Sequence, residues 1–224
     1  MADPMISPAR PTLLFVHGWA FDARFWDGLR LRLGDWPHAV ADAGYYGAPV
    51  HPRPDGPVVA IGHSLGVLRL LETLPPRCAG LVSINGFARF GGGPGFPQGV
   101  PRRLLDRMLA RLAAEPEAAV REFRQRCGAD GPGGAPRAEA LAGGLQALRD
   151  LDLRHALDAL PVPLLALAGG ADPIAPPALT QAAFAARPAA ELQWLPEGGH
   201  LLPATHAPWC AQHIRAFLAR LARP

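Results

Sequence analysis

Residues Val58 to Leu74, VVAIGHSLGVLRLLETL, decide the fold of this chain. An apolar run stops at Gly62-His63-Ser64-Leu65-Gly66, and a helical pattern begins directly after it. The five residues fit G-x-S-x-G, which makes a sharp turn when it joins a buried strand to a helix. Such a turn lifts a serine hydroxyl clear of the sheet, and the flanking glycines leave room for the backbone. We therefore predict that Ser64 is a nucleophile; the alternative is a glycine-rich turn whose serine only caps the helix.

Apolar runs alternate with helical patterns along the rest of the chain. Strands are expected at residues 11–16, 38–41, 58–61, 80–84, 164–168 and 192–195. Helices are expected around Phe25 to Leu33, over Val67 to Leu74, and at the end of the chain between Trp209 and Leu221. This order predicts an α/β fold, a mostly parallel sheet with helices on both faces. Residues 43–57 hold too much glycine and proline for a helix, so an irregular loop is expected there.

A long insertion separates the strands expected at 80–84 and 164–168. Residues 88–155, called the insertion below, open with a glycine-rich loop and hold helical patterns at about 102–125 and 139–148. Because ligands bind at the carboxyl ends of such strands, we predict a small helical lid inserted before the strand that bears the acid. The alternative is a packed helical extension with no gating role. The whole chain, residues 1–224, is expected to be a single domain.

A serine hydroxyl needs a base, and in this fold the order along the chain is serine, acid, histidine. His200 follows the last expected strand on a loop with two glycines, and we predict it to be the base. His206 is expected to cap or pack the last helix, and His213 to be exposed on it. Asp172 follows the strand at 164–168 and is the predicted acid, where it would orient the imidazole. Asp152 and Asp158 come before that strand and are expected to be caps or surface charges.

Two backbone amides are predicted to stabilise a developing oxyanion. They belong to Leu65, directly after the nucleophile, and to Trp19 in the loop after the first strand. His17, which precedes that loop, is expected to shape it. No glycine-rich dinucleotide motif and no clustered metal ligands are present in the sequence, so neither a cofactor nor a metal is expected. Three widely spaced cysteines suggest reduced, mostly buried thiols.

The composition excludes several classes of protein. The chain has 224 residues, of which 49% are hydrophobic, enough for one sizeable core. A pI of about 9.1 is typical of proteins that bind nucleic acid, but here the net charge is only +3 and all 22 basic residues are arginine, which suggests a coding bias. No run reaches the ~20 apolar residues that cross a bilayer. The first residues lack a secretory signal, so we expect a cytoplasmic protein with no membrane or nucleic-acid partner.

The motifs together resemble the α/β-hydrolase superfamily over almost the whole chain. They are LLFVHGWAFDARFW (13–26), GHSLG (62–66), GGADPIAP (169–176) and GGH (198–200). A narrower resemblance, to the bacterial pimeloyl-acyl-carrier-protein methyl ester esterases of biotin synthesis, is carried by HGW (17–19), AVREF (119–123), GGLQALRDLDLRHAL (143–157) and GGHLLPATHAPWC (198–210). Two features depart from that family. The best-known members carry tryptophan where this chain has His63, and they have a helix where this chain has residues 43–57.

The resemblance implies a serine carboxylesterase with a triad of Ser64, Asp172 and His200. It implies that Trp19 and Leu65 contact the substrate, and that Phe123 to Cys127 face the acyl chain. It also implies an acidic acyl-carrier protein as partner, met by arginines of the insertion; Arg121 and Arg124 are our candidates, although a solvated helix face would explain them as well. We expect a monomer. The alternatives are a general short-chain esterase or thioesterase of the same fold, and a non-catalytic binding protein.

Overall fold

The short apolar runs of the sequence become the strands of one sheet. The computed structural model describes residues 10–131, 134–185, 187 and 190–223; residues 1–9, where no secretory signal is expected, lie outside it. In this part of the chain six strands pair in the order β2-β1-β3-β4-β5-β6, and every pair is parallel. The strands are β1 (Thr12–Val16), β2 (His38–Ala41), β3 (Val58–His63), β4 (Cys78–Ile84), β5 (Leu164–Gly169) and β6 (Glu191–Leu195). The predicted parallel α/β fold is confirmed.

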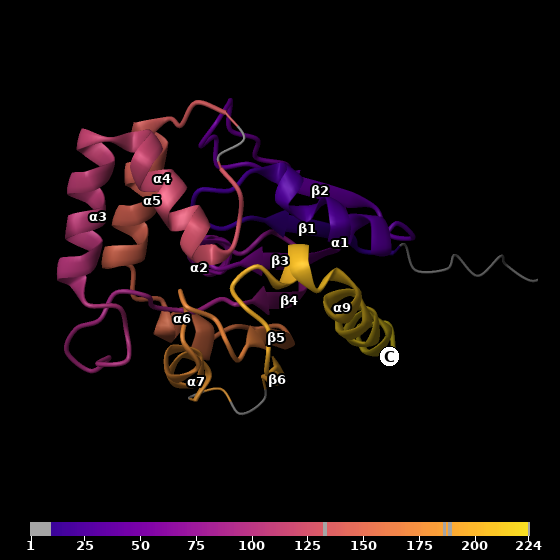
Figure 1. Ribbon diagram of the computed structural model, residues 1–224. Helices are drawn as coiled ribbons and strands as arrows, with labels where there is room; N and C mark the ends of the chain where they lie inside the picture. The colour runs from indigo at the N-terminus through magenta and orange to yellow at the C-terminus, as the bar shows by residue number, and fades with distance from the viewer. Residues whose placement is uncertain (1–9, 132–133, 186, 188–189, 224) are drawn as a thin grey trace, which may run out of the picture.

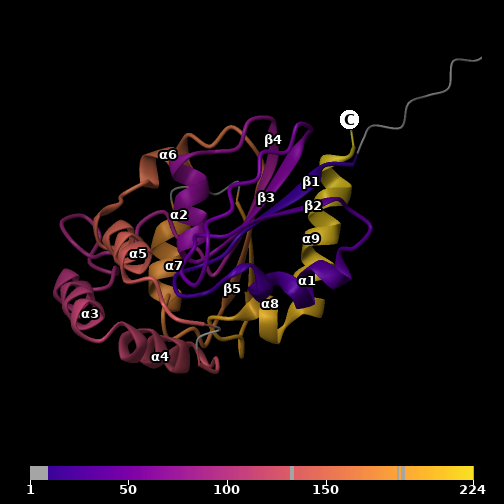
Figure 2. The same cartoon turned by 90° about the horizontal axis from the view of Figure 1, so that it is seen from above.

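Side chains along each strand point alternately to the two faces of the sheet, and different helices cover each face. Leu13 and Phe15 of β1 point to one face, where they join a core with α1 (Asp27–Arg32) and α9 (Ala207–Leu221). Leu14 points to the other face, which α2 (Leu65–Glu72) covers. Figures 1 and 2 show these two layers on opposite sides of the strands. Both faces are therefore shielded from solvent, which explains why the strands are apolar along nearly their whole length.

In its described residues, the insertion between β4 and β5 forms four helices. They are α3 (Arg102–Ala114), α4 (Pro116–Cys127), α5 (Ala138–Asp150) and α6 (Arg154–Asp158). The single helical stretch predicted at about 102–125 is thus two helices, because Glu115 is extended (φ −142°, ψ 74°) and Pro116 starts a new helix. Figure 1 shows α3, α4 and α5 together on the side of the sheet away from α9.

Three further short helices lie outside the insertion in the described chain. The helices are α7 (Pro177–Phe184), α8 (Leu202–Thr205) and a 3-10 turn, η1 (Ala23–Trp26). Residues 43–57 contain no helix, as predicted, and are tied to the end of β2 by a pair of backbone hydrogen bonds between Asp42 and Val50. Among the described residues, no helix has the length and apolar character needed to cross a membrane.

Candidate active site

Ser64 occupies the sharp turn between β3 and α2. Its backbone has φ 52° and ψ −121°, a positive φ that residues other than glycine seldom adopt. The turn is possible because Gly66 has no side chain: a Cβ atom there would lie 2.1 Å from the carbonyl oxygen of Val16 on β1. The glycine of the motif thus lets the start of α2 press against the neighbouring strand. The serine side chain is left at the carboxyl end of the sheet, beside a cavity.

Asp172 and His200 form a buried hydrogen-bonded pair. They follow β5 and β6, whose carboxyl ends are adjacent in the sheet. His200 Nδ1 donates to Asp172 Oδ2 at 2.8 Å, and each side chain is 1% exposed. The second carboxylate oxygen, Oδ1, accepts the backbone N–H groups of Ile174 at 2.7 Å and Ala175 at 2.9 Å. Because Nδ1 carries the proton, Nε2 of a neutral His200 is left as a proton acceptor.

The loops that carry this pair touch backbone to backbone. A Cβ atom at Gly169 would lie 2.3 Å from the carbonyl oxygen of Gly198, and one at Gly170 would lie 2.5 Å from that of Pro196. The N–H of Gly170 donates to the carbonyl of Leu195 across the same contact. Gly169 and Gly170, which precede Asp172, therefore serve close packing of the two loops.

Asn85 is a site residue that the sequence analysis missed. It follows β4 with φ 48° and is 1% exposed. Its Nδ2 donates to Asp172 Oδ2 at 2.7 Å and to the carbonyl of Gly199 at 2.8 Å, so one amide joins three loops. Its position was a usable signal, since a polar residue directly after an apolar strand lies at the same sheet edge as Asp172.

His63, the residue before Ser64, lies beneath His200. Its side chain is fully buried, and Nε2 is 2.8 Å from the backbone carbonyl oxygen of His200. The two imidazole rings have centroids 4.8 Å apart. Burial, with a smaller contribution from His200, holds the pKa of His63 well below its usual value. The sequence analysis assigned this residue no role.

Trp19 connects the loop after β1 to the insertion. Its indole Nε1 donates to the carbonyl of Leu141 on α5 at 2.8 Å, and its ring packs edge-on against Phe123 of α4 at 4.8 Å. Leu65 is the first residue of α2, where backbone N–H groups have no partner within the helix. His17 shapes the same loop: its Nε2 accepts the N–H of Ala43 at 3.1 Å.

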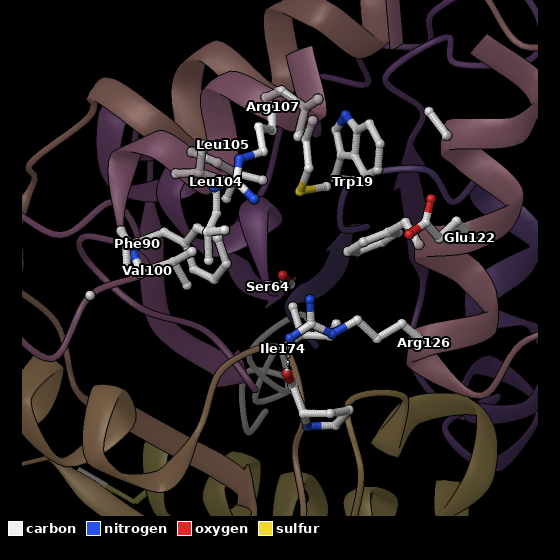
Figure 3. A pocket seen from close by; sticks show the side chains of 18 of the residues that line it. Trp19, Ser64, Phe90, Val100, Leu104, Leu105, Arg107, Glu122, Arg126 and Ile174 are labelled. Carbon is white, nitrogen blue, oxygen red and sulfur yellow. Dashed lines mark hydrogen bonds between the residues drawn. The ribbon is translucent and has the colours of Figure 1, made fainter. Parts of the chain in front are cut away.

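A cavity of about 710 Å³ lies between Ser64 and the insertion. Figure 3 shows Ser64 at its base, with Trp19 on one side, Ile174 on the other, and Arg126 reaching in from α4. Most of the wall is apolar, and the charged side chains around it are Arg107, Arg111, Glu122 and Arg126. Further apolar lining comes from Phe90, Val100, Leu104, Leu105, Met108, Phe123, Leu145 and Leu148. The shape and chemistry suit a flexible apolar substrate with a polar end.

Two residues expected to contact substrate do not line this cavity. Leu65 is 2% exposed and belongs to the core, so only its backbone is available to a ligand near Ser64. Cys127 ends α4 with its thiol turned into the protein, and burial raises its pKa to about 12. A helix presents only one face to the cavity; Phe123 and Arg126 lie on that face and Cys127 does not.

The two arginines proposed to meet a carrier protein have different surroundings. Arg124 turns inward: it donates to the carbonyls of Ala20 at 2.9 Å and Asp130 at 2.8 Å, and its guanidinium lies over the Phe21 ring at 4.6 Å. It therefore fastens α4 to the loop after β1. Arg121 is exposed, and it borders a separate hollow beside Glu115 and Glu117 rather than the cavity at Ser64.

The competing histidines lie apart from the Asp172–His200 pair. His206 is next to Thr205 Oγ1, 2.8 Å from its Nδ1, just before α9. His213 was expected to be exposed but is half-buried, because its ring packs against Trp209 at 4.6 Å. Within the described ranges, no group of three or more potential metal ligands is found.

Comparison with known proteins agrees with this geometry. Residues 13–213 match the family described as "Alpha/beta hydrolase family". A pimeloyl-acyl-carrier-protein methyl ester esterase of Stenotrophomonas maltophilia (strain K279a) is 31% identical, with 94% of each chain covered. A protein of the same name from Klebsiella pneumoniae (strain 342) is 31% identical, with 92% of this chain and 90% of the relative covered. Another, from Neisseria meningitidis serogroup B (strain H44/76), is 27% identical, with 91% of this chain and 88% of the relative covered.

Solved structures share the fold at lower sequence identity. An esterase from Exiguobacterium antarcticum superposes with a TM-score of 0.81 at 16% identity, covering 95% of this chain and 93% of that one. A thermophilic esterase from Thermogutta terrifontis has a TM-score of 0.76 at 22% identity, covering 97% and 92%. At these identities the likeness concerns the architecture alone.

Proposed function

Because this chain belongs to the alpha/beta hydrolase family, we propose that it is a serine carboxylesterase that hydrolyses the methyl ester of a pimeloyl group carried on acyl-carrier protein. The substrate follows from the relatives that share up to 31% identity over nearly the whole chain. The observation that supports the chemistry is the buried Asp172–His200 hydrogen bond at the strand ends next to the turn that bears Ser64.

The proposed reaction uses one serine and one proton carrier. Ser64 Oγ attacks the ester carbonyl while His200 Nε2 accepts the hydroxyl proton, and the N–H groups of Trp19 and Leu65 bind the oxyanion. The bond between the acyl carbon and the methoxy oxygen then breaks, and the methoxy group takes the proton from His200 and leaves as methanol. A water molecule, deprotonated by His200, attacks the acyl-enzyme. The bond between the acyl carbon and Ser64 Oγ then breaks, His200 returns the proton to Ser64 Oγ, and the free carboxylic acid leaves. Asp172 keeps the neutral His200 protonated on Nδ1, so that Nε2 can carry out these proton transfers.

The cavity supports an acyl chain of this kind. Apolar side chains from α3, α4 and α5 would bury the methylene groups, each contributing ~0.8 kcal/mol. We propose that the insertion acts as the lid over this chain, with Phe123 and Trp19 as contacts close to the reacting ester. Cys127 is not part of this surface.

The carrier protein would approach the outer side of the insertion. Arg103 and Arg107 of α3 are exposed, and neither makes an ion pair or side-chain hydrogen bond with the described residues. Their positive charge would attract an acidic carrier to the mouth of the cavity. Arg121 can take part from α4, whereas Arg124 is held by its contacts within the protein.

Complementation tests substrate and reaction together. A biotin auxotroph that lacks its methyl ester esterase should grow without biotin when it expresses this chain, and should not grow with the Ser64→Ala variant. Growth of the Ser64→Ala strain would refute the serine mechanism. Failure of the wild type, combined with hydrolysis of p-nitrophenyl butyrate, would favour a general esterase. If a fluorophosphonate does not label Ser64, the result would favour a non-catalytic binding protein.

A further inference from the structure

His63 makes closer contact with His200 than a residue that merely fills the core would need. Its Nε2 faces the His200 carbonyl oxygen at 2.8 Å, and a carbonyl can only accept, so Nε2 must carry the proton. The same ring lies under the His200 imidazole, with centroids 4.8 Å apart and an interplanar angle of 55°. One side chain thus touches both the backbone and the ring of His200.

The His63 ring is confined on its remaining sides. Phe25 lies against it with centroids 4.6 Å apart, and the rings of Phe21 and Trp26 approach at 6.2 and 6.4 Å. Gly18 closes the gap on the Nδ1 side, since a Cβ atom at that position would lie 2.8 Å from Nδ1. The ring therefore has little freedom to turn and can act as a fixed support.

The other ring nitrogen of His63, Nδ1, makes no such contact. Nδ1 is buried and has no hydrogen-bond partner among the described residues, so the polar contact of this side chain is made through Nε2–H. The ionisable groups that act on His63 are His200 and His17. A neutral ring adds no positive charge next to His200, which becomes cationic whenever it accepts the serine proton.

We infer that His63 is a positioning residue for His200: it holds the main chain of that residue through its Nε2–H, and its ring fills the space beside the imidazole. This inference rests on the proposed function, because it concerns the residue that would transfer the proton. It differs from a packing role in one respect. The loss of the hydrogen bond should slow turnover at sites that are folded and able to react.

Two substitutions separate the hydrogen bond from the ring. His63→Phe keeps a flat ring and removes the donor, whereas His63→Gln keeps an N–H at the same distance from the main chain and removes the ring. Hydrolysis of p-nitrophenyl butyrate is measured per active site, with sites counted by fluorophosphonate labelling of Ser64. In His63→Phe we expect kcat to fall by about tenfold or more, with KM nearly unchanged. In His63→Gln we expect kcat to stay within about threefold of the wild type.

The outcomes distinguish this inference from the proposed function. A kcat per labelled site in His63→Phe that equals the wild type, or an equal loss in both variants, would overturn it. If Ser64→Ala still hydrolyses the ester, the proposed function fails instead. If neither His63 variant folds, nitrogen-15 NMR of the wild type decides: the inference requires the neutral form of His63 with the proton on Nε2, and a ring protonated on Nδ1 would refute it.

Discussion

Asp172 is held by four donors, and at the scale of single residues this explains why Asn85 matters. Two backbone N–H groups bind Oδ1, while His200 and Asn85 share Oδ2. The carboxylate therefore has little freedom to rotate away from His200. The donors come from three separate parts of the chain, around residues 85, 174–175 and 200, so the arrangement depends on the folded protein.

Replacing Asn85 tests this arrangement. Asn85→Ala removes the bonds to Asp172 and to the Gly199 carbonyl, so we expect kcat to fall by about tenfold or more while KM changes little. Asn85→Asp keeps the size of the side chain but places a second carboxylate next to Asp172. The two carboxylates repel each other unless one of them is protonated. The activity of this variant relative to the wild type should therefore decline as the pH rises. Steady-state kinetics from pH 5 to 9 would measure both effects; a constant ratio would contradict the second.

Residues within short motifs could be predicted from the sequence, and those that act through the folded structure could not. Ser64 was identified because G-x-S-x-G gives both its chemistry and its backbone turn. Asp172 and His200 followed from their places after apolar strands. The place of Asn85 after a strand indicated the sheet edge, but its bond to a carboxylate more than eighty residues away depends on the folded loops, as does the bond from His63 to a distant carbonyl.

At the scale of elements, the insertion shows how a helical pattern can hide a break. The apolar spacing continues through 102–125, yet the chain turns at Glu115 and Pro116 to form α3 and α4. The sequence contained the signal, because proline is tolerated in the first turn of a helix and disfavoured in its interior. The turn lets both helices contribute to the same cavity.

The exposed face of α3 gives a prediction about the carrier protein. Arg103→Glu should lower kcat/KM for the carrier-bound ester several-fold at low salt, and the deficit should shrink as ionic strength rises. The matched control is Arg32→Glu on α1, which makes the same change in net charge on the opposite face of the sheet. Equal effects of the two substitutions would show that net charge alone, and not α3, attracts the carrier.

Asp152 fixes the base of the insertion and gives it a pH-dependent contribution to stability. It accepts from Arg154 at 2.7 Å and from Arg89 at 2.8 Å, and mainly the Arg154 contact lowers its pKa to about 2. A lowered folded-state pKa adds stability above the unfolded-state value of about 4 and loses it as the pH falls toward 2. We expect Asp152→Asn to reduce the free energy of unfolding at pH 6, and to differ less from the wild type at pH 2.5.

Urea unfolding of both proteins at the two pH values measures this contribution. Solvent screening keeps it small, since the Asp152 side chain is 37% exposed. A difference that does not change with pH would show that the carboxylate charge has no part in holding α6 to the loop after β4.

At the scale of the whole molecule, the sequence predicted the architecture better than its smaller helices. The six strands and the two covered faces followed from the apolar runs, whose alternation with helices permits few topologies. The helix α7 was not predicted, because residues 177–184 are rich in alanine and lack a marked amphipathic pattern. Its position is set by packing of Leu179 and Phe184 against the core.

The buried cysteines can report whether the insertion opens independently of the core. Cys210 lies on the buried face of α9, in the core that this helix forms with the sheet, and Cys127 lies at the end of α4; burial raises the pKa of each to about 12. If the insertion is a moving lid, a thiol reagent should modify Cys127 faster than Cys210 in native protein, as peptide mass spectrometry would show. The exposed part of Cys78 should react first. Equal protection of Cys127 and Cys210 would favour a packed extension.

The contact between the loops at Gly169-Gly170 and Pro196-Gly198 limits how this enzyme could be re-engineered. Gly169 and Gly170 have no room for a Cβ atom against the backbone of residues 196–199, so the two loops can only be exchanged as a matched pair. A loop transplanted alone from another esterase would push its neighbour aside and separate the acid from the imidazole. Anyone who grafts this site onto a new scaffold should therefore transfer both loops together.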